Sequence, residues 1–265
     1  MKIFLLCNSQ SNQVALANKI FREFQIDKIH IWEKKEKKLF FYSIKNLIAH
    51  IFTFFKFRNS WINMLNYYGK IYKEFPLKPS LILNDVNSTE YKEVIKKDKP
   101  DLVLVSGTNL LKKELIELIN MNGKVMNLHT GISPYVKGGP NCTNWCLFMR
   151  KFHLIGNTVH WIDEGIDSGD IIATEKADLN GKETLNTLHI KVMESAHLLY
   201  IKCIQSYIKN KKINSINQNN FVESKLFKTK DWKFYNMFIA LLNFYFYYND
   251  KQLKKNNLSL VKPSN

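Results

Sequence analysis

The 265-residue chain is 45% hydrophobic and 13% aromatic, which is enough for a packed core and excludes a mainly disordered protein. Its formal net charge is +16. A general preference for lysine would produce this excess as readily as an anionic partner would. The charge therefore does not by itself indicate nucleic-acid binding, and phosphorylated small molecules or an acidic membrane surface remain open as partners.

The chain begins like a βαβ unit. An apolar run at 2–7 predicts a strand, the polar turn NSQSNQ follows, and residues 14–24 have the apolar spacing of a helix. The first run ends in polar residues rather than at a small-residue cleavage site, so it is not typical of a signal peptide. Residues 28–32 predict a second strand. The basic and aromatic segment 33–72 predicts a helix with too many charges for a transmembrane span.

Strands and helices continue to alternate through the middle of the chain. The pattern predicts a short amphipathic helix within 88–100, a buried parallel-type strand at 101–107, a helix at 110–120 and a strand at 124–129. This alternation is typical of an α/β fold with a mostly parallel sheet flanked by helices. The later predicted elements are a helix at 141–152, a strand at 155–163, a loop at 164–170, a strand at 171–179 and a long helix at 184–210.

The last part of the chain changes to lysine, asparagine and aromatic residues. Residues 225–232 predict a short strand or arm, and 234–248 predict an aromatic helix. Apolar patches of this size are rarely left in water, so we expect the helix to pack against the rest of the chain or against a second copy, and we favour a homodimer. A membrane-surface binding module is the non-enzyme alternative, without stable membrane insertion.

Polar side chains gather where predicted strands end. Asn127 and His129 are two residues apart and therefore point to the same side of one strand, at the edge where open α/β sheets bind ligands. His160 lies near the end of the next strand, and Asp163 and Asp167 follow in a turn. Each residue alone also fits a structural role in a turn or core. Together, an amide donor, imidazoles and a carboxylate predict an acyl-transfer site.

These residues resemble the folate-dependent formyltransferase family, which includes glycinamide ribonucleotide, methionyl-tRNA and amino-sugar formyltransferases. The sequence departs from the family pattern at HTG, where His-Pro-Ser is usual, and at SPY, where Leu-Leu-Pro is common. Both departures affect the contour of the loop and leave the polar residues in place. The matching motifs are Asn-x-His at 127–129, the loop GISPYVKGG at 131–139, Thr-x-His at 158–160 and Asp-x-Gly at 167–169.

The resemblance implies a Rossmann-like formyltransferase domain over 1–205 and a small C-terminal extension over 206–265, which would serve as a sugar-nucleotide arm, with 225–232 near the sugar-nucleotide site, or as a dimer interface. Its donor would be 10-formyltetrahydrofolate, and no metal is implied. Asn127 and His129 would stabilise the oxyanion, Asp167 would accept the proton of the attacking amine, and His160 would orient Asp167 or tune its pKa. The pterin ring would lie between residues 106–113 and the turn at 163–167. The implied cofactor-binding residues are Thr108, Leu110, Leu111, Asp163 and Gly165.

Three acceptors are open, and a nucleotide-linked amino-deoxysugar for surface polysaccharide (O-antigen) is favoured. The run KGGPNCTNW resembles the Arg-Gly-x-x-x-x-Asn-Trp pattern of amino-sugar enzymes, with Lys137 in place of arginine. Glycinamide ribonucleotide would need a phosphate loop after the first strand, where the glycines are missing. Methionyl-tRNA enzymes normally carry a separate β-rich C-terminal domain, and the short segment after the long helix does not predict one. We therefore expect no nucleic-acid partner. The implied substrate-binding residues are Ser9, Gln10, Ser11, Lys137, Gly138, Asn144 and Trp145.

Cysteine usage indicates the compartment. The four cysteines have no spacing that is typical of a disulfide framework or of a paired metal motif. Reduced thiols and the absence of a recognisable signal peptide lead us to expect a cytoplasmic protein. The four positions are Cys7, Cys142, Cys146 and Cys203.

Overall fold

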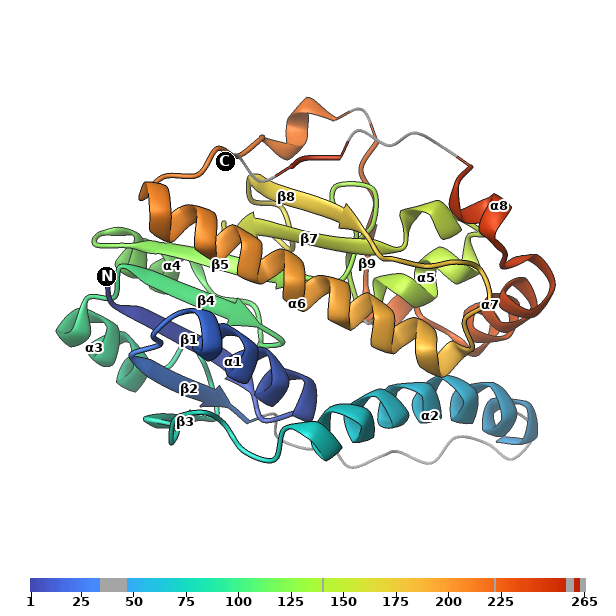
Figure 1. Cartoon of the computed structure of the whole chain (residues 1–265), viewed down its shortest axis with the longest axis horizontal. Coiled ribbons are helices and arrows are strands. Elements are labelled where there is room, and N and C mark those ends of the chain that lie inside the picture. Colours follow the sequence, from blue (N-terminus) through green and yellow to red (C-terminus); the bar gives the residue numbers. More distant parts are fainter. Residues whose placement is uncertain (34–46, 140, 222, 256–259, 263–265) are drawn as a thin grey trace.

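The computed structural model describes residues 1–33, 47–139, 141–221, 223–255 and 260–262, and it is built around one seven-stranded sheet (Figure 1). The first five strands across the sheet are parallel, the sixth runs antiparallel to them, and the seventh pairs antiparallel with the sixth. The predicted α/β fold with a mostly parallel sheet is therefore confirmed. The strands, in spatial order, are β3 (Leu81–Leu83), β2 (Lys28–Trp32), β1 (Ile3–Asn8), β4 (Leu102–Ser106), β5 (Lys124–His129), β7 (Gly156–Trp161) and β8 (Ile171–Lys176).

Helices cover both faces of the sheet and create two core layers. On one face, α1 (Ser11–Glu23), α2 (Leu47–Ile71) and α6 (Leu185–Asn210) pack on each other and on the strands. On the other face lie α3 (Thr89–Asp98) and α4 (Lys113–Asn120). The strand residues alternate between these layers because successive side chains point to opposite faces.

Helix α6 is connected directly to the strands that carry the predicted site. It begins at a capping box in which the Thr184 side chain accepts a hydrogen bond from the Thr187 N–H. Further along, the buried Tyr200 hydroxyl donates to the Met126 carbonyl at 2.6 Å and accepts from the Val105 N–H at 3.0 Å. Since both backbone groups belong to β4 and β5, this tyrosine fixes the helix against the two strands next to the site.

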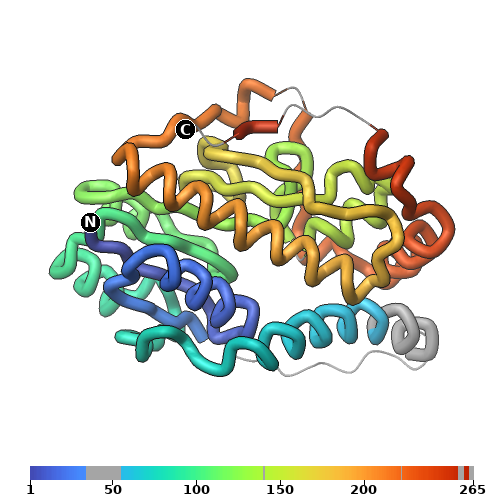
Figure 2. The backbone as a smooth tube through the Cα atoms, viewed as in Figure 1, coloured from blue at the N-terminus to red at the C-terminus, as the bar shows by residue number. Residues whose placement is uncertain are grey.

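The chain after α6 folds back onto the rest of the molecule. It runs along the β8 edge (Figure 2), and Ile216 forms a β-bridge with Ile171 there. The short strand β9 (Leu226–Phe227) then pairs in parallel with β6 (Lys137–Gly138). Helix α7 (Phe234–Tyr247) packs on α5 (Cys142–Phe148) and forms a third apolar cluster with it, and the short helix α8 (Asp250–Leu253) follows.

Several element boundaries differ from the sequence prediction. Helix α1 begins at Ser11, three residues before the apolar pattern does, whereas α6 ends at Asn210 as predicted. The helix predicted to reach residue 152 ends at Phe148, because Arg150 takes a left-handed conformation with φ 57° and a 3-10 helix follows. Of the predicted helix over 33–72, residues 34–46 lie outside the described part. No described helix is both long and apolar enough to cross a membrane.

Candidate functional site

A cleft of about 560 Å³ opens at the carboxyl ends of β1, β4 and β5. This is the edge at which open α/β sheets bind ligands. The loops after β1, β4 and β5 line it, together with the loop between β7 and β8 and the segment that begins with β9. The predicted polar residues Asn127, His129, His160 and Asp167 all lie in its lining.

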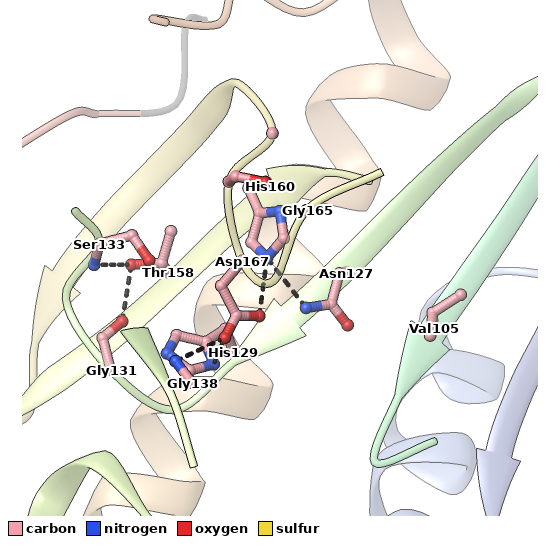
Figure 3. A network of polar contacts seen from close by, with 12 residues as sticks. Val105, Asn127, His129, Gly131, Ser133, Gly138, Thr158, His160, Gly165 and Asp167 are labelled. Atoms are coloured by element: carbon pink, nitrogen blue, oxygen red, sulfur yellow. Dashed lines mark hydrogen bonds and ion pairs between the residues drawn. The ribbon is translucent and has the colours of Figure 1, made fainter. Parts of the chain in front are cut away.

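Asn127 and His160 face each other across neighbouring strands. They are direct partners in the antiparallel pairing of β5 with β7, and Asn127 Nδ2 lies 2.9 Å from His160 Nε2 (Figure 3). His160 Nδ1 lies 2.7 Å from the carbonyl oxygen of Trp161, which only accepts. In the neutral ring Nδ1 therefore carries the hydrogen, and Nε2 accepts from the Asn127 amide.

The carboxylate of Asp167 lies between the two imidazoles (Figure 3). Its Oδ2 is 3.3 Å from His129 Nδ1 and accepts from the Gly138 N–H at 2.8 Å, and its Oδ1 is 3.5 Å from His160 Nε2. Burial alone would raise the pKa of Asp167, but His129, His160 and the Gly138 N–H hold it well below its ordinary value. Asp167 is therefore a carboxylate at neutral pH and is able to accept a proton.

The backbone places Asp167 there at some conformational cost. Its φ is 49°, in the left-handed region that few residues other than glycine adopt. The Gln218 amide donates to the carbonyls of Asp167 and Gly169, at 2.7 Å each. Gln218 follows α6, so the C-terminal part of the chain supports the turn that presents this carboxylate.

His129 is held as a neutral ring. Burial lowers its pKa, and the Asp167 carboxylate opposes this only in part. Its Nδ1 faces the carboxylate, so Nδ1 carries the hydrogen and Nε2 is left as an acceptor. The thiol of Cys142 lies 3.4 Å from that Nε2. Nothing in the sequence pattern around Cys142 indicates this contact.

Of the predicted cofactor-binding residues, Asp163 alone is absent from the cleft lining. Its carboxylate accepts from the Gly165 N–H at 3.0 Å and from the Ser168 hydroxyl at 2.5 Å, so it shapes the turn before Asp167. A side chain at Gly165 would meet the Ser168 oxygen at 1.9 Å, which explains why glycine occupies this position. The other predicted cofactor-binding residues line the cleft: Thr108, Leu110, Leu111 and Gly165.

Some of the predicted substrate-binding residues line the cleft, and others lie outside it. Gln10 and Gly138 line the cleft. Trp145 is buried behind it, stacked on Phe227 with ring centroids 4.4 Å apart, and its indole N–H donates to the Gly139 carbonyl at 3.0 Å. The remaining residues of the prediction lie outside the lining as well: Ser9, Ser11, Lys137 and Asn144.

Sequence reasoning missed the lining that comes from α2 and α6. Trp61 of α2 and Met193 of α6 belong to helices whose patterns indicate only core and surface. Phe227, Lys228 and Thr229 lie within 225–232, which the sequence predicts as an arm near the acceptor site, although it singles out none of the three. Among the described residues, no group of three histidine, cysteine, aspartate or glutamate side chains could hold a metal ion.

Comparison with known proteins gives the context for this site. The formyl transferase family model matches residues 72–204, half of the chain. Methionyl-tRNA formyltransferase of Finegoldia magna is 27% identical over 196 residues, which cover 68% of this chain and 62% of that protein. The chain thus spans less than two thirds of the length of this relative.

Two solved structures share the fold. One is an N-formyltransferase from Helicobacter canadensis in complex with folinic acid and dTDP-3-aminofucose, 18% identical, with a TM-score of 0.56 over 91% of this chain and 80% of that one. The other is a formyltransferase from Anoxybacillus kamchatkensis in complex with tetrahydrofolate and UDP-4,6-dideoxy-4-formamido-L-AltNAc. It is 18% identical, with a TM-score of 0.51 over 96% of this chain and 97% of that one.

Proposed function

The chain belongs to the formyl transferase family, and from that membership we propose that it transfers a formyl group from 10-formyltetrahydrofolate to the primary amine of a nucleotide-linked amino-deoxysugar. The observation that carries the choice of acceptor is the pairing of β9 with β6. This pairing brings the C-terminal segment into the wall of the cleft, next to Asp167, and leaves a bounded site for a small acceptor. The two solved relatives with bound nucleotide sugars support the same choice.

The polar residues divide the chemistry between them. Asn127 would donate a hydrogen bond toward the formyl oxygen, where negative charge develops during attack by the amine. The oxyanion role expected of His129 does not fit the neutral ring, because its hydrogen on Nδ1 is directed at Asp167, and His129 would instead orient that carboxylate. Asp167, a carboxylate at neutral pH, would accept the proton that the amine loses. His160 accepts from the Asn127 amide at Nε2 and so holds that amide in position, which leaves the orientation of Asp167 to His129 and the Gly138 N–H.

One end of the cleft fits a formyl-folate, which supplies the formyl group when bound. Val105 and Leu111 are buried apolar side chains there, and Ile162 packs against the same core layer. The backbone of residues 106–110 borders them. An apolar slot with backbone N–H and carbonyl groups along its rim suits a flat pterin ring, whose edge carries donors and acceptors.

The other wall would hold the acceptor. Lys228 and Thr229 line the cleft next to Gly138 and Gly139, where a cation and a hydroxyl suit a diphosphate. Trp145, with its neighbour Asn144, would support this wall from behind through its stack on Phe227. Lys137, in β6, would add positive charge close to the same wall.

Methionyl-tRNA is the second candidate acceptor, because the curated relative with 27% identity carries that name. Glycinamide ribonucleotide is the third. A panel of nucleotide-linked amino sugars, glycinamide ribonucleotide and methionyl-tRNA, each incubated with 10-formyltetrahydrofolate, tests the choice through formylated product by mass spectrometry. Formylation of a nucleotide sugar alone supports the proposal. Formylation of methionyl-tRNA or of glycinamide ribonucleotide alone replaces it.

The exposed aromatic face of α7 bears on assembly. Tyr235, Tyr245 and Phe246 are 64%, 61% and 74% exposed, on a helix whose other face packs on α5. We propose that a second copy of the chain covers this face, giving a homodimer. We also propose a cytoplasmic setting, which the four buried and unpaired cysteines support.

A further inference from the structure

The cleft spans both core layers of the protein. Leu111 and Ile162 belong to the layer between the sheet and α3 and α4. Met193 and Trp61 also line the cleft, but they belong to the layer of α1, α2 and α6 on the opposite face of the sheet. A pterin ring at the first end therefore leaves the second end for a different chemical group.

The second end combines an aromatic ring with unpaired amides. Trp61 is partly buried, and its ring meets His189 edge-on at 6.5 Å between centroids. Asn12 and Gln13 are 2% and 5% exposed, and among the described residues neither side-chain oxygen has a hydrogen-bond partner. The Asn12 amide nitrogen reaches only the Met193 sulfur, at 3.8 Å. Buried amide groups without partners are costly, so this end is built to receive donors and acceptors.

This end is also neutral. Apart from its two histidines, the described lining of the cleft has two charged side chains, Asp167 and Lys228. A ligand group between an indole and carboxamides is therefore a planar, uncharged ring with polar edges rather than a phosphate. Nucleobases have this chemistry: they stack on aromatic side chains and exchange hydrogen bonds with asparagine and glutamine amides.

Helix α2 places this ring next to the wall that carries the cation. Phe57, one turn before Trp61, meets the ring of Trp232 edge-on at 6.1 Å between centroids. Trp232 follows Lys228 and Thr229 on the same segment. A base at Trp61 and a diphosphate at Lys228 would thus be neighbours, as they are in one nucleotide. Trp61 precedes the matched range 72–204, so the family match does not account for it.

We infer that Trp61 and Asn12 form the subsite for the nucleobase of the acceptor. The base would stack on the Trp61 ring, and the Asn12 amide would form hydrogen bonds with its polar edge. This inference rests on the proposed function, since it assigns a base to the nucleotide-linked substrate. It predicts that the protein binds nucleoside diphosphates without any sugar or folate.

Isothermal titration calorimetry with UDP, dTDP and inorganic diphosphate tests this on the full chain. Trp61→Phe keeps an aromatic face and Trp61→Leu does not, while both keep an apolar side chain. We expect Trp61→Leu to bind UDP or dTDP roughly 10- to 100-fold more weakly than wild type, and Trp61→Phe to stay within a few-fold. Diphosphate should bind all three proteins equally. Tyr67→Leu, an exposed tyrosine on the same helix, is the matched control and should leave every affinity unchanged.

Folinic acid, titrated in parallel, reports whether the other end of the cleft is intact. Equal UDP and dTDP affinities in Trp61→Leu and Trp61→Phe would overturn the inference, and so would the failure of wild type to bind either nucleotide. These titrations need no formyl transfer. If nucleotide binding depends on Trp61 but no nucleotide sugar is formylated, the proposed function is wrong and this inference stands. If a nucleotide sugar is formylated with equal KM by Trp61→Leu and Trp61→Phe, this inference is wrong and the proposed function stands.

Discussion

Asn127 and His160 hold each other in a single orientation, with Asn127 Nδ2 2.9 Å from His160 Nε2. His160 Nδ1 is committed to the Trp161 carbonyl, so Nε2 is free to accept. One N–H of the Asn127 amide is used on the imidazole, and the second remains for a substrate. The pair therefore pre-orients a donor before any ligand arrives, which is the arrangement that makes electrostatic stabilisation effective.

Replacing Asn127 by alanine should lower kcat about 100- to 1000-fold, the usual effect of removing one oxyanion donor. KM for both substrates should change far less, because the lost interaction acts on charge that develops during the reaction. Steady-state kinetics with the best acceptor of the panel measures this. Asn66→Ala, an exposed amide on α2, is the control for an asparagine substitution as such. A loss confined to KM would remove Asn127 from its proposed role.

Asp167 and Asp163 lie in the same turn but contact different groups, which allows a direct contrast. Asp167→Asn should reduce kcat by about 100-fold or more, because the carboxylate that accepts the proton is lost. Asp163→Asn keeps an acceptor for the Ser168 hydroxyl and should cost less than about tenfold. Thermal unfolding of both variants shows whether the turn survives. Equal losses of kcat would mean that the turn matters only as a whole.

Buried histidines make stability depend on pH. Burial lowers the pKa of His189 to about 4 and that of His197 well below its ordinary value, and His30 and His129 are lowered as well. The unfolded chain therefore binds more protons below pH 6.5, so the free energy of unfolding should fall as pH drops from 7 to 5. Neither ring nitrogen of His197 has a hydrogen-bond partner among the described residues.

His197→Phe removes one of these titrating groups. Its free energy of unfolding should fall less steeply between pH 6 and pH 5, by up to about 1.4 kcal/mol per pH unit, the value for one proton. Urea unfolding at each pH gives the slope. The slope is the deciding quantity, because the larger phenyl ring also alters packing around Tyr68. Identical slopes in the two proteins would show that His197 does not contribute to the pH dependence.

Phe227 connects the C-terminal segment to the cleft. Phe227→Ala should destabilise the fold by about 3–5 kcal/mol, as for other buried phenylalanines, and should raise KM for the acceptor more than KM for the folate. The neighbouring Leu226 is 42% exposed, so Leu226→Ala is the matched control and should be close to neutral. If both KM values rise together, the segment supports the whole cleft rather than its acceptor wall.

A charge on the exposed face of α7 should break the proposed dimer. Phe246→Lys places an ammonium at the most exposed of its aromatic positions, and light scattering should then report half the wild-type mass. Met121→Lys, at a 77% exposed methionine at the end of α4, should leave the mass unchanged. A wild-type monomer that sediments with anionic vesicles would contradict the dimer and favour membrane docking.

The sequence was sufficient to predict the mostly parallel sheet and to identify the polar residues at the centre of the site. Asn127 and His129 share a face because strand side chains alternate, and that periodicity is local. It does not report strand direction, however, because alternation is the same for parallel and antiparallel strands. That β7 runs antiparallel to β5, which makes Asn127 and His160 direct partners, became visible only in the fold.

Contacts between distant segments are what the sequence could not provide. Trp61 lines the cleft because α2 packs on α6, and Phe227 lines it because two residues of β9 pair with β6. Each of these pairings is set by tertiary packing, and an aromatic residue in a helix or a short arm looks the same whether it meets core or ligand. Asp163 and Trp145 are the converse case: both lie close to the site in sequence, and their side chains support it from outside the cleft lining.

The β6–β9 pairing also dictates the order in which a newly made chain completes its cleft. During synthesis, residues 137–138 leave the ribosome well before residues 226–227, and the Gly138 N–H contacts Asp167 in a loop that β9 borders. A side chain at Gly138 would meet the Phe227 carbonyl at 2.1 Å, so the two segments come together at backbone contact. A nascent chain that already has Asn127, His129 and Asp167 therefore still has an open wall, and the site closes only once residues 226–227 have been translated.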